Sequence, residues 1–120
     1  MHAIATDLET GLIQIDVKGF WTLDHVEAFA SDVREAARQV MKAGKRQVIL
    51  YDYTGAPIQA AAVVAALQAL AQDNAFRSRK VALYTGSPLA RRQAKTIAAH
   101  GHSMQAFEHR DVAIAWLLAA

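Results

Sequence analysis

Hydrophobic and polar residues alternate in a segment close to the start of the chain. In Leu12–Lys18 the side chains at positions 13, 15 and 17 are apolar and those at 14, 16 and 18 are polar, a pattern typical of a strand that is buried on one face. A weaker strand is predicted at Ile4–Asp7, and Glu9–Gly11 between the two is a favourable turn. We therefore expect the fold to open with an antiparallel hairpin.

A long amphipathic helix is predicted between Thr22, a suitable N-cap, and Gly44, a residue that favours a helix end. Within it, apolar residues recur at spacings of three and four, so that they share one side of the helix. The members of this apolar stripe are Leu23, Val26, Phe29, Val33, Ala37 and Val40. We expect the stripe to face the core.

Short apolar strands and helices alternate in the rest of the chain. The predicted strands are Val48–Tyr51, Val81–Thr85 and Met104–Phe107. The predicted helices are Gln59–Gln72, a segment from Pro88 to about His100, and Asp111–Leu118, in which Val112, Ala115, Trp116 and Leu118 are expected to face the core.

This order, strand–strand–helix followed by three strand–helix pairs, predicts a single α/β domain over residues 1–120. Helices between successive strands imply right-handed crossovers. We expect a mixed, mostly parallel sheet of about five strands with helices packed on it, and with the opening strand antiparallel at an edge. Because Val48–Tyr51 is apolar on both faces, it is expected to be a central strand.

Composition narrows the functional classes. The chain has 120 residues, 53% of them hydrophobic, and no cysteine, which excludes disulfides and thiolate metal sites. No apolar run approaches the ~18 residues that span a bilayer, and the first residues do not resemble a secretory signal. We therefore expect a cytoplasmic protein without an integral membrane segment.

Charge is distributed unevenly along the chain. Residues 1–41 hold seven acids and three bases, a net charge of −4, whereas residues 42–120 hold ten bases and four acids, a net charge of +6. Such asymmetry favours an acidic partner or head-to-tail self-association; the simpler alternative is that the two halves neutralise each other across one surface. No block of five bases and no aromatic-plus-basic stripe points to nucleic acid.

The segment Arg46–Pro57 combines a basic strand entrance, the predicted central strand and a polar turn. In an α/β protein the loop that leaves such a strand is a common place for ligand and partner contacts. The candidate contact residues here are Asp52, Tyr53, Thr54, Gly55 and Pro57. No charge occurs between Tyr53 and Gln72, so the alanine-rich helix after the loop either packs closely on the sheet or meets a partner.

A second candidate site lies where the next strand meets its helix. Thr85 ends that strand, Ser87 is a suitable N-cap, and Pro88 suits the first helical position. The amides of this helix start, together with the positive charges of Arg91 and Arg92, could bind an anion. The alternative is a solvated basic face that is capped for stability.

Nucleotide, hydrolase and phosphoaspartate chemistry find little support in the sequence. No Gly-rich phosphate loop occurs, and Thr85–Pro88 lacks the G-x-S-x-G turn of a nucleophile elbow. Asp52 stands at a strand end like a receiver phosphoacceptor, but the strand before it ends in Lys18 and Gly19 rather than in acids. The simpler interpretation is that Asp52 accepts hydrogen bonds from nearby loop amides.

Three histidines near the end of the chain raise the question of a metal site. His100, His102 and His109 lie close together in sequence, but only Glu108 stands nearby as a carboxylate. This ligand set is thin for a metal ion, and surface histidines are the simpler interpretation. We expect no metal, no cofactor and no enzymatic activity.

Three short segments, together with the order of elements, are similar to recurring signatures of a known group of proteins. They are Gly19–Thr22 before the amphipathic helix, Val48–Asp52, and Asp111–Leu117. The chain resembles the STAS domain of anti-sigma-factor antagonists and sulfate transporters, and more closely the SpoIIAA-like group of STAS-like proteins. The resemblance covers nearly the whole chain, and it implies a regulatory or ligand-binding module without catalysis.

One departure from the STAS pattern changes the expected regulation. In antagonist STAS domains the central strand runs into Asp–hydrophobic–Ser–Gly and, a few residues later, into Asp–Ser–Ser–Gly, whose serine a partner kinase phosphorylates. Here Asp52–Gly55 matches the first part, but the second part falls on Ala60–Val63, which has no hydroxyl. A phosphoserine switch is therefore not expected at that position.

These observations predict a regulatory or protein-interaction module that contacts a protein partner, or a second copy of itself, through the Tyr53–Pro57 loop and the alanine-rich helix. The alternative is a module that binds a small anionic or apolar, lipid-like ligand beside that loop. A hydrolase that uses Ser87 or a histidine is the third and least supported class.

Overall fold

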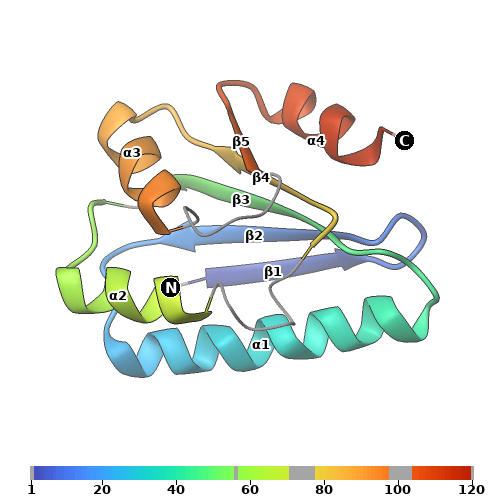
Figure 1. Ribbon diagram of the computed structural model, residues 1–120, viewed down its shortest axis with the longest axis horizontal. Coiled ribbons are helices and arrows are strands. Elements are labelled where there is room, and N and C mark those ends of the chain that lie inside the picture. Colours follow the sequence, from blue (N-terminus) through green and yellow to red (C-terminus); the bar gives the residue numbers. More distant parts are fainter. Residues whose placement is uncertain (1, 56, 71–77, 98–103, 120) are drawn as a thin grey trace.

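Five strands form one mixed sheet in the computed structural model, which describes residues 2–55, 57–70, 78–97 and 104–119. β1 (His2–Asp7) and β2 (Leu12–Lys18) pair antiparallel, and β3 (Val48–Gly55), β4 (Lys80–Tyr84) and β5 (Met104–Phe107) follow in parallel with β2. The strands lie side by side in sequence order, with β3 in the centre (Figure 1). The predicted hairpin, mostly parallel sheet and central strand are confirmed.

Four helices cover the two faces of the sheet in the described part of the chain. They are α1 (Leu23–Lys42), α2 (Ala61–Leu70), α3 (Pro88–Ile97) and α4 (Arg110–Leu118). α1 and α2 pack on one face, α3 contacts α2 and β4, and α4 lies on the opposite face over β3, β4 and β5 (Figure 1). The predicted helix ends near Gln72 and His100 lie outside the described residues. No described helix is long and apolar enough to cross a membrane.

Gly11 allows the hairpin to fit against the central strand. Its backbone has a φ of +81°, which glycine adopts without strain, and its N–H donates to the carbonyl of Asp7 at 2.9 Å. A Cβ at this position would come within 2.5 Å of the Arg46 carbonyl oxygen. The Gly11 carbonyl in turn accepts from Val48 N at 3.0 Å. This turn therefore requires glycine both for its backbone shape and for its closeness to the segment that enters β3.

The face of the sheet covered by α1 and α2 carries the larger core. Its buried side chains include Ile13, Ile15 and Val17 of β2 and Val26, Phe29, Val33 and Val40 of α1. Thr22 caps α1 as predicted, because its Oγ1 accepts from His25 N at 3.2 Å. Leu23 is a correction to the predicted stripe: it is 53% exposed, since the first turn of α1 extends past the ends of the strands (Figure 1).

α4 presents a different side to the sheet from the one predicted. Val112, Ala115 and Leu118 are exposed, so the prediction that they face the core is wrong, whereas Trp116 is half-buried and packs against the core as predicted. Ala113 and Leu117 are fully buried instead. The physical reason is that Arg110, the first residue of the helix, donates a hydrogen bond to Asp52 of the sheet. Residues 110, 113 and 117 lie three and four positions apart and therefore share one side.

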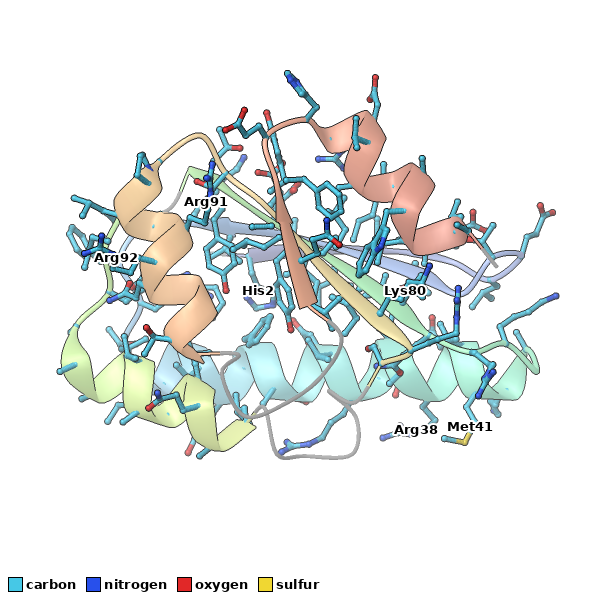
Figure 2. The ribbon with its side chains drawn as sticks, turned by 45° about the horizontal axis from the view of Figure 1, so that its top comes forward. His2, Arg38, Met41, Lys80, Arg91 and Arg92 are labelled. Carbon is cyan, nitrogen blue, oxygen red and sulfur yellow. The ribbon has the colours of Figure 1, made fainter. Side chains whose placement is uncertain are left out.

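Two cationic side chains cap the C-terminal end of α4. Arg79 donates to the carbonyls of Leu117 at 2.9 Å and Ala119 at 3.3 Å, and Lys80 donates to those of Trp116 at 2.7 Å and Ala119 at 3.1 Å. Lys80 Nζ also lies 5.0 Å from the centre of the Trp116 ring (Figure 2). The last carbonyls of a helix lack partners within it and carry the negative end of its dipole, so these bases stabilise α4.

We expect Leu117→Ala to lower the free energy of unfolding by about 2–5 kcal/mol, because it empties a fully buried position between α4 and the sheet. Leu118→Ala, at the neighbouring 43% exposed position, is the matched control and should lower it by less than about 1 kcal/mol. Urea unfolding followed by circular dichroism measures both. Equal losses for the two variants would contradict the observed orientation of α4.

Candidate functional site

The carboxyl ends of β2, β3 and β4 meet at one edge of the sheet, beside α2 and α3 (Figure 1). We call it the carboxyl edge; in α/β folds it is the usual place for ligands. β3 continues to Gly55, further than predicted, because Gly55 pairs with Lys18 and its carbonyl accepts from Gly19 N at 3.2 Å. Tyr53 and Thr54 therefore belong to the strand, and the predicted contact loop is shorter.

Alternation along β3 places the predicted contact residues on two faces of the sheet. Tyr51 and Tyr53 face α1 and α2, with ring centres 5.9 Å apart, and pack against the larger core. Asp52, between them, faces α4. Burial raises the pKa of both phenols, so both are neutral at physiological pH. Asp52 and Tyr53 consequently do not share one site.

On the α4 side, Arg110 holds two neighbouring carboxylates. Asp16 and Asp52 are directly paired across β2 and β3. Arg110 donates to Asp52 Oδ2 at 2.9 Å and to Gln14 Oε1, and its Nη1 lies 4.0 Å from Asp16 Oδ1. Like charges side by side on adjacent strands repel each other, so the guanidinium supplies the positive charge that this pair needs.

This arrangement answers the question of phosphoaspartate chemistry at Asp52. An acid does stand beside Asp52, contrary to the argument from the strand end, because the register pairs Asp52 with Asp16 and not with the last residue of β2. A guanidinium lies against both carboxylates. The remaining Asp52 oxygen, Oδ1, accepts from Thr54 N at 3.0 Å, as predicted for an aspartate near a turn. Asp52 therefore acts as a structural acceptor in this conformation.

A buried glutamine joins three segments at the carboxyl edge. Gln59 is 8% exposed; its Oε1 accepts from Trp21 N at 2.9 Å, and its Nε2 donates to the carbonyls of Gly19 at 3.0 Å and Pro57 at 3.4 Å. The Gln59 backbone is held by Gln93 of α3, through an N–H···Oε1 bond of 2.8 Å and an Nε2–H···O=C bond of 3.1 Å. The loop after β2, the loop after β3 and α3 are therefore locked together.

Four large apolar side chains are exposed around this joint. They are Phe20 (76%), Leu23 (53%), Ile58 (43%) and Leu89 (63%), and we call them the apolar edge. Phe20 lies between the two residues that the Gln59 side chain holds, and Ile58 directly precedes Gln59. Leu89 lies one helical turn before Gln93. Large apolar side chains exposed together mark interaction sites on soluble proteins.

The hydroxyls and amides at the start of α3 are engaged within the chain. Ser87 Oγ accepts from Ala90 N at 3.2 Å, which confirms Ser87 as the N-cap. Ser87 N donates to the Oγ1 of buried Thr85, also at 3.2 Å. Two of the donors and acceptors expected to serve an anion therefore have internal partners.

The two arginines of the predicted anion site behave differently. Arg91 donates to the Thr85 carbonyl at 3.5 Å and lies 3.8 Å from Glu108, whereas Arg92 points to a different side of α3 (Figure 2). Among the buried side-chain nitrogen and oxygen atoms of the described residues, only Arg91 Nε has no hydrogen-bond partner. Anion binding at this position stays a prediction.

The residues described by the structure contain no group of three or more His, Asp or Glu side chains that could hold a metal. His109 directly precedes α4 and is exposed. His100 and His102 lie outside the described residues. The expectation that the chain holds no metal stays a prediction.

Sequence reasoning did not find Asp16, Gln59, Arg110 or the apolar edge. Arg110 carried a usable signal, because a cation at the first position of a helix opposes the helix dipole and requires a compensating acid. Asp16 stands on the polar side of β2. A polar side chain at such a position is as compatible with a strand face in contact with solvent as with one that a helix covers. No sequence pattern identifies Gln59, since its partners are mostly backbone atoms, which every residue has.

No protein-family model matches this chain, and no curated protein is similar to it in sequence. Among solved structures, the chain is similar to an uncharacterised protein of the DUF3478 family from Shewanella loihica PV-4, which has a SpoIIAA-like fold. The TM-score is 0.73 at 18% sequence identity, over 98% of this chain and 92% of that chain. At this identity the similarity shows the fold alone: the chain has a SpoIIAA-like α/β fold, as the sequence resemblance implied.

We expect Gln59→Ala to lower the free energy of unfolding by about 1–3 kcal/mol, because it removes the bond to the Gly19 carbonyl and leaves the buried Trp21 N–H without a partner. Hydrogen exchange of the Trp21 amide should become faster. Gln39→Ala, on the exposed side of α1, is the control and should leave both quantities nearly unchanged. An unchanged exchange rate of the Trp21 amide in Gln59→Ala would show that Gln59 does not hold the loops after β2 and β3 together.

Arg110→Ala should destabilise the fold by about 1–2 kcal/mol at neutral pH, because it leaves Asp16 and Asp52 as neighbouring carboxylates without a counter-charge. Adding Asp52→Asn should restore part of this loss, since it removes one of the two like charges. Urea unfolding of the wild type, both single variants and the double variant measures the coupling. Purely additive effects would show that Arg110 and Asp52 act independently.

Proposed function

We propose that this chain is a non-catalytic protein-interaction module of a regulatory kind, and that it contacts its partner through the apolar edge. One observation supports this most directly: Phe20, Ile58 and Leu89 are exposed on three segments that Gln59 joins. Contact between apolar surface and water is unfavourable, and a partner that covers these side chains removes it.

The hydrogen bonds of Gln59 support binding by a prearranged surface. Loops that order only on binding lose conformational entropy at that moment, which weakens the complex. Here Gln59 fixes the backbone on both sides of Phe20, and Gln93 fixes Gln59 to α3. The partner therefore meets side chains whose backbone positions are already set.

The outer side of α2 supports close approach of another chain. Val63 and Leu67 are buried, whereas the alanines at positions 61, 62, 65 and 69 are exposed, and no residue of Ala61–Leu70 carries a charge. Small uncharged side chains allow two backbones to approach closely, and no charge must be desolvated. α2 follows Gln59 by two residues, so it adjoins the apolar edge through the backbone.

Regulation of this module is proposed to come from its partners and not from serine phosphorylation at the start of α2. Ala60, Ala61 and Ala62 are exposed there, where a kinase could reach a residue, but none of them has a hydroxyl. Asp52 and Ser87, the groups closest to a catalytic chemistry, are engaged by Arg110 and by the backbone of α3. These contacts favour binding over catalysis.

Binding of a small anionic or lipid-like ligand beside the Tyr53–Pro57 loop is the second candidate. No hydrogen bond to the Tyr51 or Tyr53 hydroxyl is found within the described ranges, and Arg91 Nε is buried without a partner. Neutral phenols and one guanidinium N–H are suitable donors to a carboxylate or phosphate headgroup. Native mass spectrometry separates the candidates, because a bound small molecule adds a discrete mass to the monomer.

We expect Phe20→Ser combined with Leu89→Ser to reduce recovery of the partner by about tenfold or more, because exposed apolar anchors carry most of the binding energy in such interfaces. The tagged chain is purified gently from its native cells, and co-purifying proteins are quantified by mass spectrometry. Sedimentation of the purified chain tests whether the partner is a second copy.

Met41→Ser is the matched control, because Met41 is 75% exposed at the other end of α1 (Figure 2). It should leave partner recovery unchanged. Equal recovery of the same protein by the wild type and the double variant would exclude the apolar edge as the contact surface. A monomer that brings down neither protein nor small molecule would count against both candidate functions.

A further inference from the structure

Two histidines and an aspartate form a hydrogen-bonded chain between β1 and α1. His2 Nδ1 lies 2.9 Å from His25 Nε2, and His2 Nε2 lies 2.7 Å from Asp32 Oδ2. His2 is the first residue of β1 (Figure 2). His25 and Asp32 belong to the first half of α1. We call the series His25–His2–Asp32 the histidine latch, because it joins the start of the edge strand to the helix.

Aromatic rings enclose the centre of the latch. The His2 side chain is only 9% exposed, and the ring centres of Trp21 and Phe29 lie 5.8 and 5.4 Å from that of His2. The Trp21 ring also stacks on His25, with centres 4.4 Å apart and 30° between the planes. Since water has little access to His2, every donor there must meet an acceptor within the protein.

The hydrogen bonds of the latch are compatible with one added proton but not with two. The Asp32 carboxylate is an acceptor, so His2 Nε2 carries a hydrogen; in the neutral latch His2 Nδ1 then accepts from His25 Nε2. One added proton preserves this arrangement, because one N–H still faces one lone pair. Two added protons place an N–H on both nitrogens, only 2.9 Å apart, and the two rings must separate.

The groups around His25 have opposing effects on its uptake of a proton. Burial lowers the pKa of His25, with smaller effects from the positive amino terminus and from His2. On α1 the acids of the first half of the helix are Asp24, Glu27 and Asp32, whose negative charges favour a proton on His25 instead. On β1 the one titratable side chain besides His2 is Asp7, at the far end of the strand. β2 contributes Lys18 at its end, and α2 carries no charge along Ala61–Leu70.

The sign of the pH dependence follows from this lowered pKa. An unfolded histidine takes up its proton near its ordinary pKa of 6.5, whereas folded His25 does so at a lower pH. Between these values the unfolded chain binds more protons than the folded chain. The contribution of His25 to stability is therefore complete above pH 6.5 and decreases as the pH falls below it.

Trp21 connects the latch to the apolar edge. Its backbone N–H donates to Gln59 Oε1, and its indole N–H donates to the Lys18 carbonyl at 3.1 Å. Phe20 directly precedes Trp21, and Leu23 follows two residues later. A change in the packing of His25 on Trp21 consequently acts on the segment that carries two of the four residues of the apolar edge.

We propose that the histidine latch is an acid-sensitive switch: uptake of a second proton separates His2 from His25 and releases Trp21 together with the segment that carries Phe20 and Leu23. The switch depends only on the contacts of the latch. Its effect on a partner rests, in addition, on the proposed function of the apolar edge.

Tryptophan fluorescence tests the switch directly. The chain has two tryptophans, so Trp116→Phe leaves Trp21 as the single tryptophan, which is excited selectively at wavelengths where the three tyrosines do not absorb. From about pH 7.5 to about pH 5 we expect its emission to shift to longer wavelength, because Trp21, now 6% exposed, gains contact with water. Far-ultraviolet circular dichroism should stay unchanged, which separates opening of the latch from global unfolding.

His25→Gln in the same background should abolish the shift, because an amide presents either a donor or an acceptor to His2 and takes up no proton. The acid-induced fall in melting temperature should also be smaller, by about 4 °C, than in the parent. His109→Gln, which removes an exposed histidine outside the latch, should keep the full response.

Nuclear magnetic resonance of the imidazole nitrogens in the unsubstituted chain gives a second reading that needs no tryptophan variant. It should show the contact between His2 and His25 at neutral pH and its loss in acid. Emission and imidazole signals that do not change with pH, or that change equally in His25→Gln, would overturn the proposal. No partner takes part in these measurements, so their outcome is independent of the proposed interaction function.

Discussion

The single side chain of Gln59 determines how the segments at the carboxyl edge are placed relative to one another. An amide offers one acceptor and one donor group, and both groups of Gln59 are bonded to the backbone of the loop after β2. Because Gln59 and Trp21 are buried, water cannot replace the bond between them, and moving the loops apart would leave the Trp21 N–H without a partner. The exposed side chains of the apolar edge owe their positions to this constraint.

The ion cluster around Arg110 plays a similar part on the other face of the sheet. Asp16 and Asp52 would repel each other across β2 and β3, and the guanidinium of α4 compensates both. The same contact fixes the rotation of α4, so that Ala113 and Leu117 enter the core. One arginine therefore links the electrostatics of the sheet to the packing of the helix that covers it.

The elements of this fold could be predicted because their signals are local. Alternation in Leu12–Lys18 and caps such as Thr22 and Ser87 depend on neighbouring residues, and the structure confirms them. The rotation of α4 could not be predicted from apolar residues, since Val112 and Leu118 are more hydrophobic than Ala113. What decides it is a contact between Arg110 and Asp52, 58 residues away.

The candidate site was harder to predict from the sequence, because its contacts also join residues that lie far apart in the chain. Gln59 reaches Gly19 across 40 residues, and His2 reaches Asp32 across 30. Such pairs leave no periodic pattern, because each partner is a single polar residue among unrelated neighbours. The predicted contact segment at Tyr53–Pro57 lies at the carboxyl edge, and the alternation of β3 divides the residues around it between two faces.

The capping of α4 by Arg79 and Lys80 has a consequence for folding kinetics. These bases stand at the entrance to β4, and the carbonyls they hold lie between 36 and 40 residues later in the chain. Contacts over such separations form only after the intervening chain has been brought together, whereas the β1–β2 hairpin closes locally. We therefore expect these contacts to form after the folding transition state and to act chiefly on the unfolding rate. On this expectation the two cations influence how long the folded state of α4 persists more than how quickly the chain reaches it.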